Sequence, residues 1–331
     1  SIVFITHKLR EVRAVADDIT VIRRGTVVGT ASPQSSESEL ANKMVGRSVM
    51  MKVEKAPASP SGGGLVFDDV SLLSPSGVPV LDHLSFGVER GEIVAVAGVQ
   101  GNGQTELAEA VLGLQTPDSG TISLEGADIT RTNPRASLDA GIGFIPEDRT
   151  TDGIIASFSI ADNLVLDQFT SREFSAGGSL KLGAIARNAR EKEKEYDIRL
   201  TSVSDPISSL SGGNQQKVVV AREISKDLTL LVANQPTRGV DVGSIEFIHR
   251  RIVDVRDQGC AVLLISSELD EVVALADRIA VMYRGRLVGI VPPDTGRDVL
   301  GLMMAGVPLD EAVAASRGSA DTEDVDGEEK K

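Results

Sequence analysis

The stretch Leu210-Ser-Gly-Gly-Asn-Gln-Gln-Lys217 decides the fold, and an apolar run with helical spacing follows it. Its adjacent glycines, Gly212 and Gly213, leave backbone N–H groups uncovered where a helix begins, and the helix dipole favours an anion at that end. Ser211 adds a hydroxyl and Asn214 an amide beside them. We therefore expect this segment to contact the γ-phosphate of a nucleotide. A capped helix start without a ligand is the alternative interpretation.

A second glycine-rich stretch lies further upstream and reads Gly98-Val99-Gln100-Gly101-Asn102-Gly103-Gln104-Thr105. A short apolar run of the buried-strand type, 93–97, precedes it, and residues with helical spacing follow it. Strand, glycine loop and helix in this order form a phosphate cradle, and Thr105 can place its hydroxyl on Mg²⁺. Gln104 stands where such a loop carries lysine. For the loop taken alone, tight strand-to-helix packing by glycine is therefore an alternative.

The chain also repeats itself at a fixed offset of 260 positions. Identical residues include the pairs Ile5/Ile265, Leu9/Leu269, Glu11/Glu271, Asp17/Asp277, Gly25/Gly285 and Gly46/Gly306. We therefore interpret residues 1–46 as the C-terminal end of a first domain and residues 65–307 as a second copy. The rest of the first copy would precede Ser1. Within the repeat His7 is aligned with Ser267, so only one copy has an imidazole at this position.

Composition and charge narrow the class of protein. An apolar fraction of 41% supports a large buried core, and no apolar run approaches the roughly 20 residues that a membrane helix needs. A formal net charge of −14 without a basic stripe argues against nucleic acid as a partner. One cysteine, Cys260, excludes a disulfide framework and fits a small buried side chain. The Pro/Gly/Ser-rich segment within 47–64 predicts a linker, and residues 308–331 a disordered acidic tail.

The segment 210–217 together with the loop 98–105 resembles the ATP-binding subunits of ABC transporters. The resemblance covers nearly the whole chain outside the linker and the acidic tail. It implies an α/β fold, a P-loop NTPase core with a mixed sheet and a helical subdomain, and ATP with Mg²⁺ as cofactors. It further implies head-to-tail pairing of two domains, so that each ATP lies between one P-loop and the signature segment of the opposite domain.

Further motifs of this family fall on definite positions. Residues 142–149 occupy the Q-loop position, with Glu147 in place of glutamine. Residues 228–241 resemble the Walker B strand and the D-loop that ends at Asp241. Asn234 replaces the aspartate linked to the metal, and Gln235 replaces the glutamate that orients the attacking water. His7 fills the position of the catalytic switch histidine, which is Ser267 in the second copy.

These exchanges predict unequal ATP sites. Gln104 removes a cation from the phosphates, Asn234 removes charge at the metal, and Gln235 cannot accept a proton; loss of a general base alone costs roughly 10² to 10⁴ in rate. We expect the second copy's own site to be nearly inactive. Its signature would serve the P-loop of the first copy, which retains His7, so that one composite site is competent and one is degenerate.

Tandem copies with this asymmetry resemble importers of simple sugars and related solutes, and the segments around Gly98 and Asn234 resemble the nucleoside-importing branch. The resemblance implies integral membrane permease subunits as partners, a solute-binding lipoprotein as an indirect partner, and a peripheral location on the cytoplasmic face of the cell membrane. Sugars remain the alternative solute. A non-hydrolysing regulatory ABC module and an ABC ATPase with a role outside transport remain alternative functions.

Overall fold

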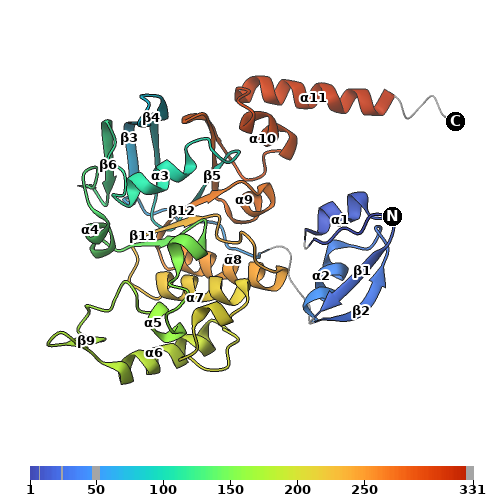
Figure 1. Cartoon of the computed structure of the whole chain (residues 1–331). Helices are drawn as coiled ribbons and strands as arrows, with labels where there is room; N and C mark the ends of the chain where they lie inside the picture. Colours follow the sequence, from blue (N-terminus) through green and yellow to red (C-terminus); the bar gives the residue numbers. More distant parts are fainter. Residues whose placement is uncertain (7, 24, 47–52, 326–331) are drawn as a thin grey trace. The chain divides into compact units, whose positions relative to one another are not determined.

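The computed structural model describes residues 1–331 apart from 7, 24, 47–52 and 326–331 (Figure 1). The chain divides into two compact units. One comprises residues 1–55, 149–222 and 237–252, and the other residues 56–148, 223–236 and 253–331. Helices α7 (Gly212–Ile224) and α8 (Val242–Asp257) begin in the first unit and end in the second.

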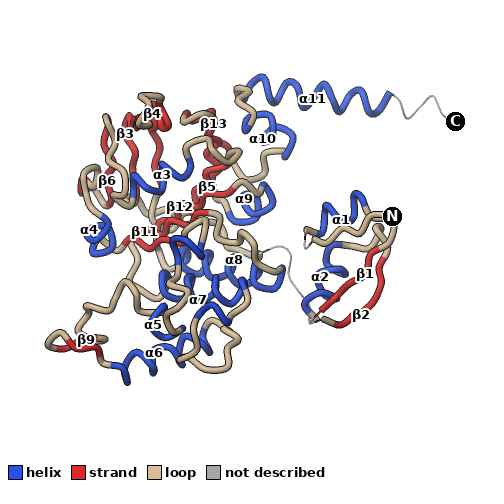
Figure 2. The backbone as a smooth tube through the Cα atoms, in the orientation of Figure 1, coloured by secondary structure: helices blue, strands red, loops and turns tan. Residues whose placement is uncertain are grey.

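A six-stranded mixed sheet forms the centre of the second unit (Figure 2). Its strand order is β14 (Arg286–Val291), β13 (Arg278–Tyr283), β5 (Ile93–Ala97), β12 (Ala261–Ser266), β11 (Leu230–Asn234) and β8 (Ile142–Ile145). Only β14 runs antiparallel to its neighbour. Every residue of β5, β11 and β12 is buried. These strands are almost wholly apolar because a parallel sheet is covered on both faces.

An antiparallel sheet of four strands packs into the same hydrophobic core. Its order is β4 (Pro79–Val88), β3 (Leu65–Leu73), β6 (Ser119–Leu124) and β7 (Ala127–Asp128). Phe67 and Phe86 stack across β3 and β4 with ring centroids 4.7 Å apart. Leu107 and Val111 of α3 (Gln104–Val111) join this core, so the glycine loop before α3 has a rigid support. The predicted α/β core with a mixed sheet is confirmed.

Four further helices complete the second unit, namely α4 (Pro134–Asp139), α9 (Leu269–Leu275), α10 (Arg297–Met304) and α11 (Leu309–Val325). The expectation of a disordered tail from residue 308 differs from the structure at α11. Ala312 is fully buried and α11 packs against α10, so the alanine-rich start of this segment has a reason to be helical. Residues 326–331 lie outside the described part of the chain.

The first unit contains a helical subdomain and the N-terminal segment. The subdomain consists of a π-helix (Arg149–Gly153), α5 (Ile160–Asn163), β9 (Ser175–Ala176), β10 (Ser179–Leu180), α6 (Leu182–Glu195), a 3₁₀ turn (Ile207–Ser209) and the starts of α7 and α8. Asn163 is fully buried there, and its amide donates to the carbonyls of Ile155, Phe158 and Ser159. The fold therefore includes the helical subdomain that the resemblance implies.

The sequence repeat reappears in the secondary structure. The N-terminal segment runs α1 (Leu9–Val15), β1 (Ile19–Arg23), β2 (Thr26–Ala31) and α2 (Glu37–Val45), the same order as α9, β13, β14 and α10. The two antiparallel hairpins even share their irregularity, between Val21 and Ile22 in one and between Val281 and Met282 in the other. Both segments therefore follow one structural pattern at the same offset as the sequence.

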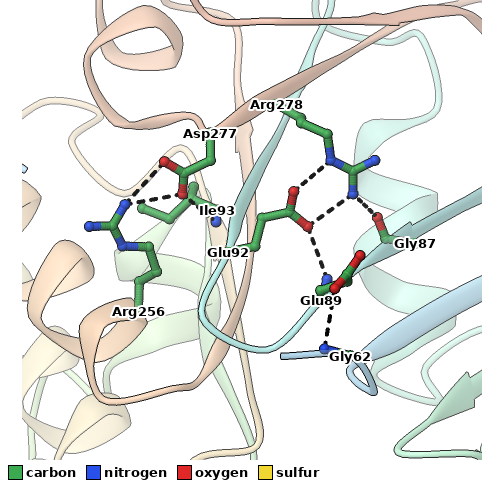
Figure 3. A network of polar contacts seen from close by, with 8 residues as sticks. All are labelled: Gly62, Gly87, Glu89, Glu92, Ile93, Arg256, Asp277 and Arg278. Carbon is green, nitrogen blue, oxygen red and sulfur yellow. Dashed lines mark hydrogen bonds and ion pairs between the residues drawn. The ribbon is translucent and has the colours of Figure 1, made fainter. Parts of the chain in front are cut away.

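Part of the predicted linker is bound to the second unit. Arg256, which is only 1% exposed, donates to the carbonyl of Ala56. Arg256 also pairs with Asp277, and Asp277 accepts the amide of Ile93 at the start of β5 (Figure 3). The amide of Gly62 donates to Glu89. Residues 56–64 thus have defined partners in place of the free chain expected for 47–64.

An ion pair between the buried Glu92 and the partly exposed Arg278 extends the network. Glu92, 4% exposed, accepts two hydrogen bonds from Arg278, and Arg278 also donates to the carbonyl of Gly87 (Figure 3). The guanidinium's bonds to Glu92 raise the pKa of Arg278 above its ordinary value. Glu92 directly precedes β5, the strand that ends at the glycine loop. The start of this strand is therefore held by Asp277 at Ile93 and by Arg278 at Glu92.

Candidate functional site

The glycine loop 98–103 joins the end of β5 to the start of α3. Gly101 and Gly103 have φ angles of 87° and 102°, in the region that favours glycine. A Cβ on Gly103 would lie 2.4 Å from the carbonyl oxygen of Val80. The first N–H groups of α3 have no acceptor within the helix, so they can bind an anion at this end. The loop has the backbone of a phosphate cradle.

Gln104 occupies this cradle with its own side chain. Its Oε1 accepts a hydrogen bond from the amide of Asn102 at 3.1 Å, and its Nε2 donates to the carbonyl of Val99 at 3.2 Å. The side chain is 7% exposed, whereas Thr105 beside it is exposed. The loop therefore offers a phosphate neither a lysine nor all of its amides, and the residues present do not fit a bound triphosphate in this conformation.

The loop is also fixed by the turn between β13 and β14. Asn102 accepts two backbone hydrogen bonds from this turn, one at its carbonyl from Gly285 at 2.9 Å and one at Oδ1 from Arg284 at 3.0 Å. Arg284 adopts a φ of 47°, which is unusual for a residue with a side chain. We did not predict this contact. The Arg-Gly pair of this turn, 284–285, recurs in the sequence at 24–25. A sequence repeat does not show, however, which residue the turn contacts.

Glu147 lies next to the glycine loop. Gln100 Nε2 donates to Glu147 Oε1 at 2.7 Å. The structure therefore brings together two segments that are 47 positions apart in the sequence. Gln100, which forms this contact, was not among the residues predicted for the site.

The carboxyl ends of β5, β12 and β11 meet at one edge of the sheet. In the parallel register Ala97 is paired with Ser266 and Asn234 with Ile265. Ligands of α/β proteins bind at such an edge. The glycine loop, Gln235 and Ser267 all follow these strand ends, so the structure places the predicted catalytic and phosphate-binding positions of the second copy on the same side.

Gln235 and Ser267, which the sequence predicts to stand at two exchanged catalytic positions, are bonded to each other. Gln235 Nε2 donates to Ser267 Oγ at 3.1 Å, and the Ser267 hydroxyl lies 3.4 Å from Gln235 Oε1. Gln235 has a φ of 49°, and its backbone amide donates to the carbonyl of Ile265. Asn234 before it is 4% exposed. Neither amide side chain can act as a general base, because an amide does not accept a proton near neutral pH.

The signature residues lie in the first unit, where they begin α7. Asn214 bridges them to a neighbouring loop: its Nδ2 donates to Ser211 Oγ at 3.0 Å and its Oδ1 accepts the amide of Arg199 at 2.8 Å. A Cβ on Gly212 would lie 2.5 Å from the guanidinium of Arg149. The Arg149 side chain therefore lies close to the bare backbone of Gly212 and would have to shift to admit a larger residue there.

Asp241 lies beside the signature and caps α8. Its carboxylate accepts the amide and the hydroxyl of Ser244, and a Cβ on Gly213 would lie 2.5 Å from its Oδ2. A capping role thus accounts for its carboxylate, and its predicted place in a nucleotide site remains a prediction. The signature and Asp241 belong to one unit and the glycine loop to the other. His7 lies outside the described residues.

The middle of the chain, residues 81–238, matches the family model described as "ABC transporter". The chain contains an ABC transporter ATP-binding domain. Solved ATP-binding cassettes have the same fold. A nucleotide-free cassette from an ABC transporter superimposes with a TM-score of 0.60 at 20% identity, covering 76% of this chain and 99% of that one, and the ADP conformation of MJ1267 with a TM-score of 0.59.

Curated proteins align with this chain over most of its length. The "Nucleoside import ATP-binding protein NupA" of Lactococcus lactis is 46% identical, over 94% of this chain and 62% of that protein. The "Guanosine import ATP-binding protein NupO" of Bacillus subtilis is 45% identical, over 91% and 60%. The "Glucose import ATP-binding protein TsgD13" of Haloferax volcanii is 44% identical, over 92% and 56%. The chain thus spans 56–62% of the length of these relatives.

Proposed function

We propose that this chain is part of the ATP-binding subunit of an ABC importer of nucleosides, and that its own glycine loop belongs to a degenerate ATP site. Two of the relatives, at 45–46% identity, carry names that refer to nucleosides or guanosine. A third, at 44%, carries a name that refers to glucose, which supports simple sugars as the alternative solute.

The contact between Gln235 and Ser267 carries the proposal of a degenerate site. In the family pattern these positions hold a glutamate and a histidine that act on the attacking water. Here two uncharged side chains bind each other, so neither is available to orient water or to hold a proton. Asn234 supplies no charge for Mg²⁺, because its side chain is a neutral amide.

The signature supports the other half of the proposal. Ser211, Gly212 and Gly213 keep the hydroxyl and the uncovered amides that a γ-phosphate requires. In a head-to-tail pair they would contact the nucleotide held by the P-loop of the first copy, whose switch histidine would be His7. Permease subunits at the cytoplasmic face of the membrane would receive the resulting movement, and a solute-binding lipoprotein would deliver the solute from outside. No helix in the described part of the chain is long and apolar enough to cross a membrane.

Two measurements test this function. Steady-state phosphate release by this chain alone should remain near the buffer background, and turnover at or above about 1 s⁻¹, the low end of typical enzymes, would contradict the degenerate site. Cells with the intact system should take up a labelled purine or pyrimidine nucleoside, and a gene deletion should abolish the uptake. Competition by ribose or galactose, with no competition by nucleosides, would assign the system to sugars.

A non-hydrolysing regulatory module is the second candidate, favoured by the same Gln235–Ser267 contact. The two candidates differ in the longer protein that carries a complete first copy. The importer requires ATP hydrolysis that depends on His7, whereas the regulatory module binds nucleotide without turnover. ATPase measurements on that longer protein, reconstituted with its permease, therefore separate them.

A further inference from the structure

The side chain of Gln104 does more than omit the charge of a lysine. A lysine has three donors and no acceptor, whereas a glutamine has one acceptor oxygen and two donors. Gln104 uses both ends within the loop, at Asn102 and Val99. It also lies against Gly98, where a Cβ would come within 2.5 Å of Gln104 Nε2. The side chain thus bridges the two sides of the loop.

The acceptor end competes directly with an anion. A phosphate binds such a loop through backbone N–H groups, and each N–H group offers one hydrogen. The Oε1 of Gln104 takes the hydrogen of Asn102 at 3.1 Å. An oxygen of the protein therefore stands where an oxygen of the phosphate would be bound.

Asn102 cannot turn away from this contact without losing others. Its carbonyl and its Oδ1 both accept hydrogen bonds from the β13–β14 turn, and its side chain is buried. The backbone of Asn102 is therefore held in place from the other side. Of the two partners in the contact, Gln104 is the one that can leave, by a change of side-chain rotamer.

We propose that Gln104 closes the glycine loop from within, and that the phosphates of a nucleoside di- or triphosphate enter this loop only when the Gln104 side chain has released the amide of Asn102. This proposal rests on the proposed ATP-binding function and adds a regulatory contact to its degenerate site. Closure costs binding affinity, because part of the binding free energy is spent on displacing the side chain.

Calorimetric titration with MgATP tests the closure. Gln104→Ala should bind at least about fivefold more tightly than the unmodified chain, since one neutral hydrogen bond corresponds to about that factor. Gln104→Glu keeps an acceptor for Asn102 and adds a negative charge, so it should bind more weakly than the unmodified chain. Gln115→Ala removes a glutamine after α3 that bonds to Glu109, and it serves as the matched control with unchanged affinity. Equal or weaker binding by Gln104→Ala would overturn the proposal.

Amide hydrogen exchange gives a readout that needs no nucleotide. The Asn102 amide should be protected in the unmodified chain and in Gln104→Glu, and should exchange faster in Gln104→Ala. Unchanged protection in Gln104→Ala would show that the side chain does not hold this amide and would overturn the proposal. Rapid ATP hydrolysis by the unmodified chain would contradict the degenerate site alone, because binding and exchange report on loop closure independently of turnover.

Discussion

Replacing Arg256 by methionine should destabilise the second unit strongly. Arg256 has a fully buried side chain that pairs with Asp277 at 3.0 Å and donates to the carbonyl of Ala56 at 3.0 Å. Methionine preserves much of the volume but leaves the carboxylate of Asp277, itself only 11% exposed, without its cation. Removal of one partner from a buried pair costs about 3–5 kcal/mol. We expect a loss of this size in the free energy of unfolding.

Urea unfolding followed by circular dichroism measures this loss. The matched control is Arg250→Met on the same helix, α8, because the Arg250 side chain is 61% exposed and its pair with Glu246 is an i,i+4 helix pair open to solvent on the arginine side. Such pairs contribute about 0–1 kcal/mol, so the control should unfold almost like the unmodified chain. Hydrogen exchange at the linker amide of Gly62 gives a local readout, and we expect it to accelerate in Arg256→Met. A loss below about 1 kcal/mol, with unchanged exchange in the linker, would refute the anchoring role of Arg256.

Three further outcomes are expected. In a longer protein that carries a complete first copy, His7→Ala should abolish transport-coupled ATP hydrolysis, while Ser267→Ala should change it little. ATPase assays of the two variants side by side measure this difference. Equal losses would contradict the proposed asymmetry between the two ATP sites. In the same protein Gly212→Asp should abolish ATPase activity by repelling the phosphate, although the folded state is retained because the neighbouring Arg149 end is flexible; intact activity would mean that the signature does not face a phosphate. Cys260 should resist alkylation by iodoacetamide at pH 8 until the chain unfolds, because burial raises the pKa of its thiol to about 12 and only the thiolate reacts. Mass spectrometry measures the extent of alkylation. Rapid alkylation of the native chain would contradict the burial of Cys260.

Local signals in the sequence were enough to predict the core, whereas the site residues remain predictions. The apolar run 93–97 before a glycine loop specifies strand, loop and helix through neighbouring residues alone, and the structure has β5 and α3 there. The signature glycines likewise begin a helix as expected. Cys260, expected as a small buried side chain, is 4% exposed.

Contacts between distant residues were beyond this reasoning. The bond of Gln235 to Ser267 spans 32 positions, and the bond of Arg256 to Ala56 spans 200. The sequence does not indicate a partner for Gln235 or Arg256, because glutamine and arginine side chains are most often solvated. The inward turn of Gln104 depends on side-chain rotamers, which no sequence pattern specifies. For α11, a polar composition suggested disorder, whereas in the structure the helix contacts α10 and Ala312 is fully buried.

The bond from Arg256 to Ala56 determines where the predicted linker joins the second unit. Nine residues, 47–55, separate Gly46 from Ala56, whereas an unanchored linker would extend to residue 64. The segment 56–64 is held at Ala56 by Arg256 and at Gly62 by Glu89. The chain therefore enters the second unit at Ala56, nine residues before β3 begins, and Arg256 sets that point of entry.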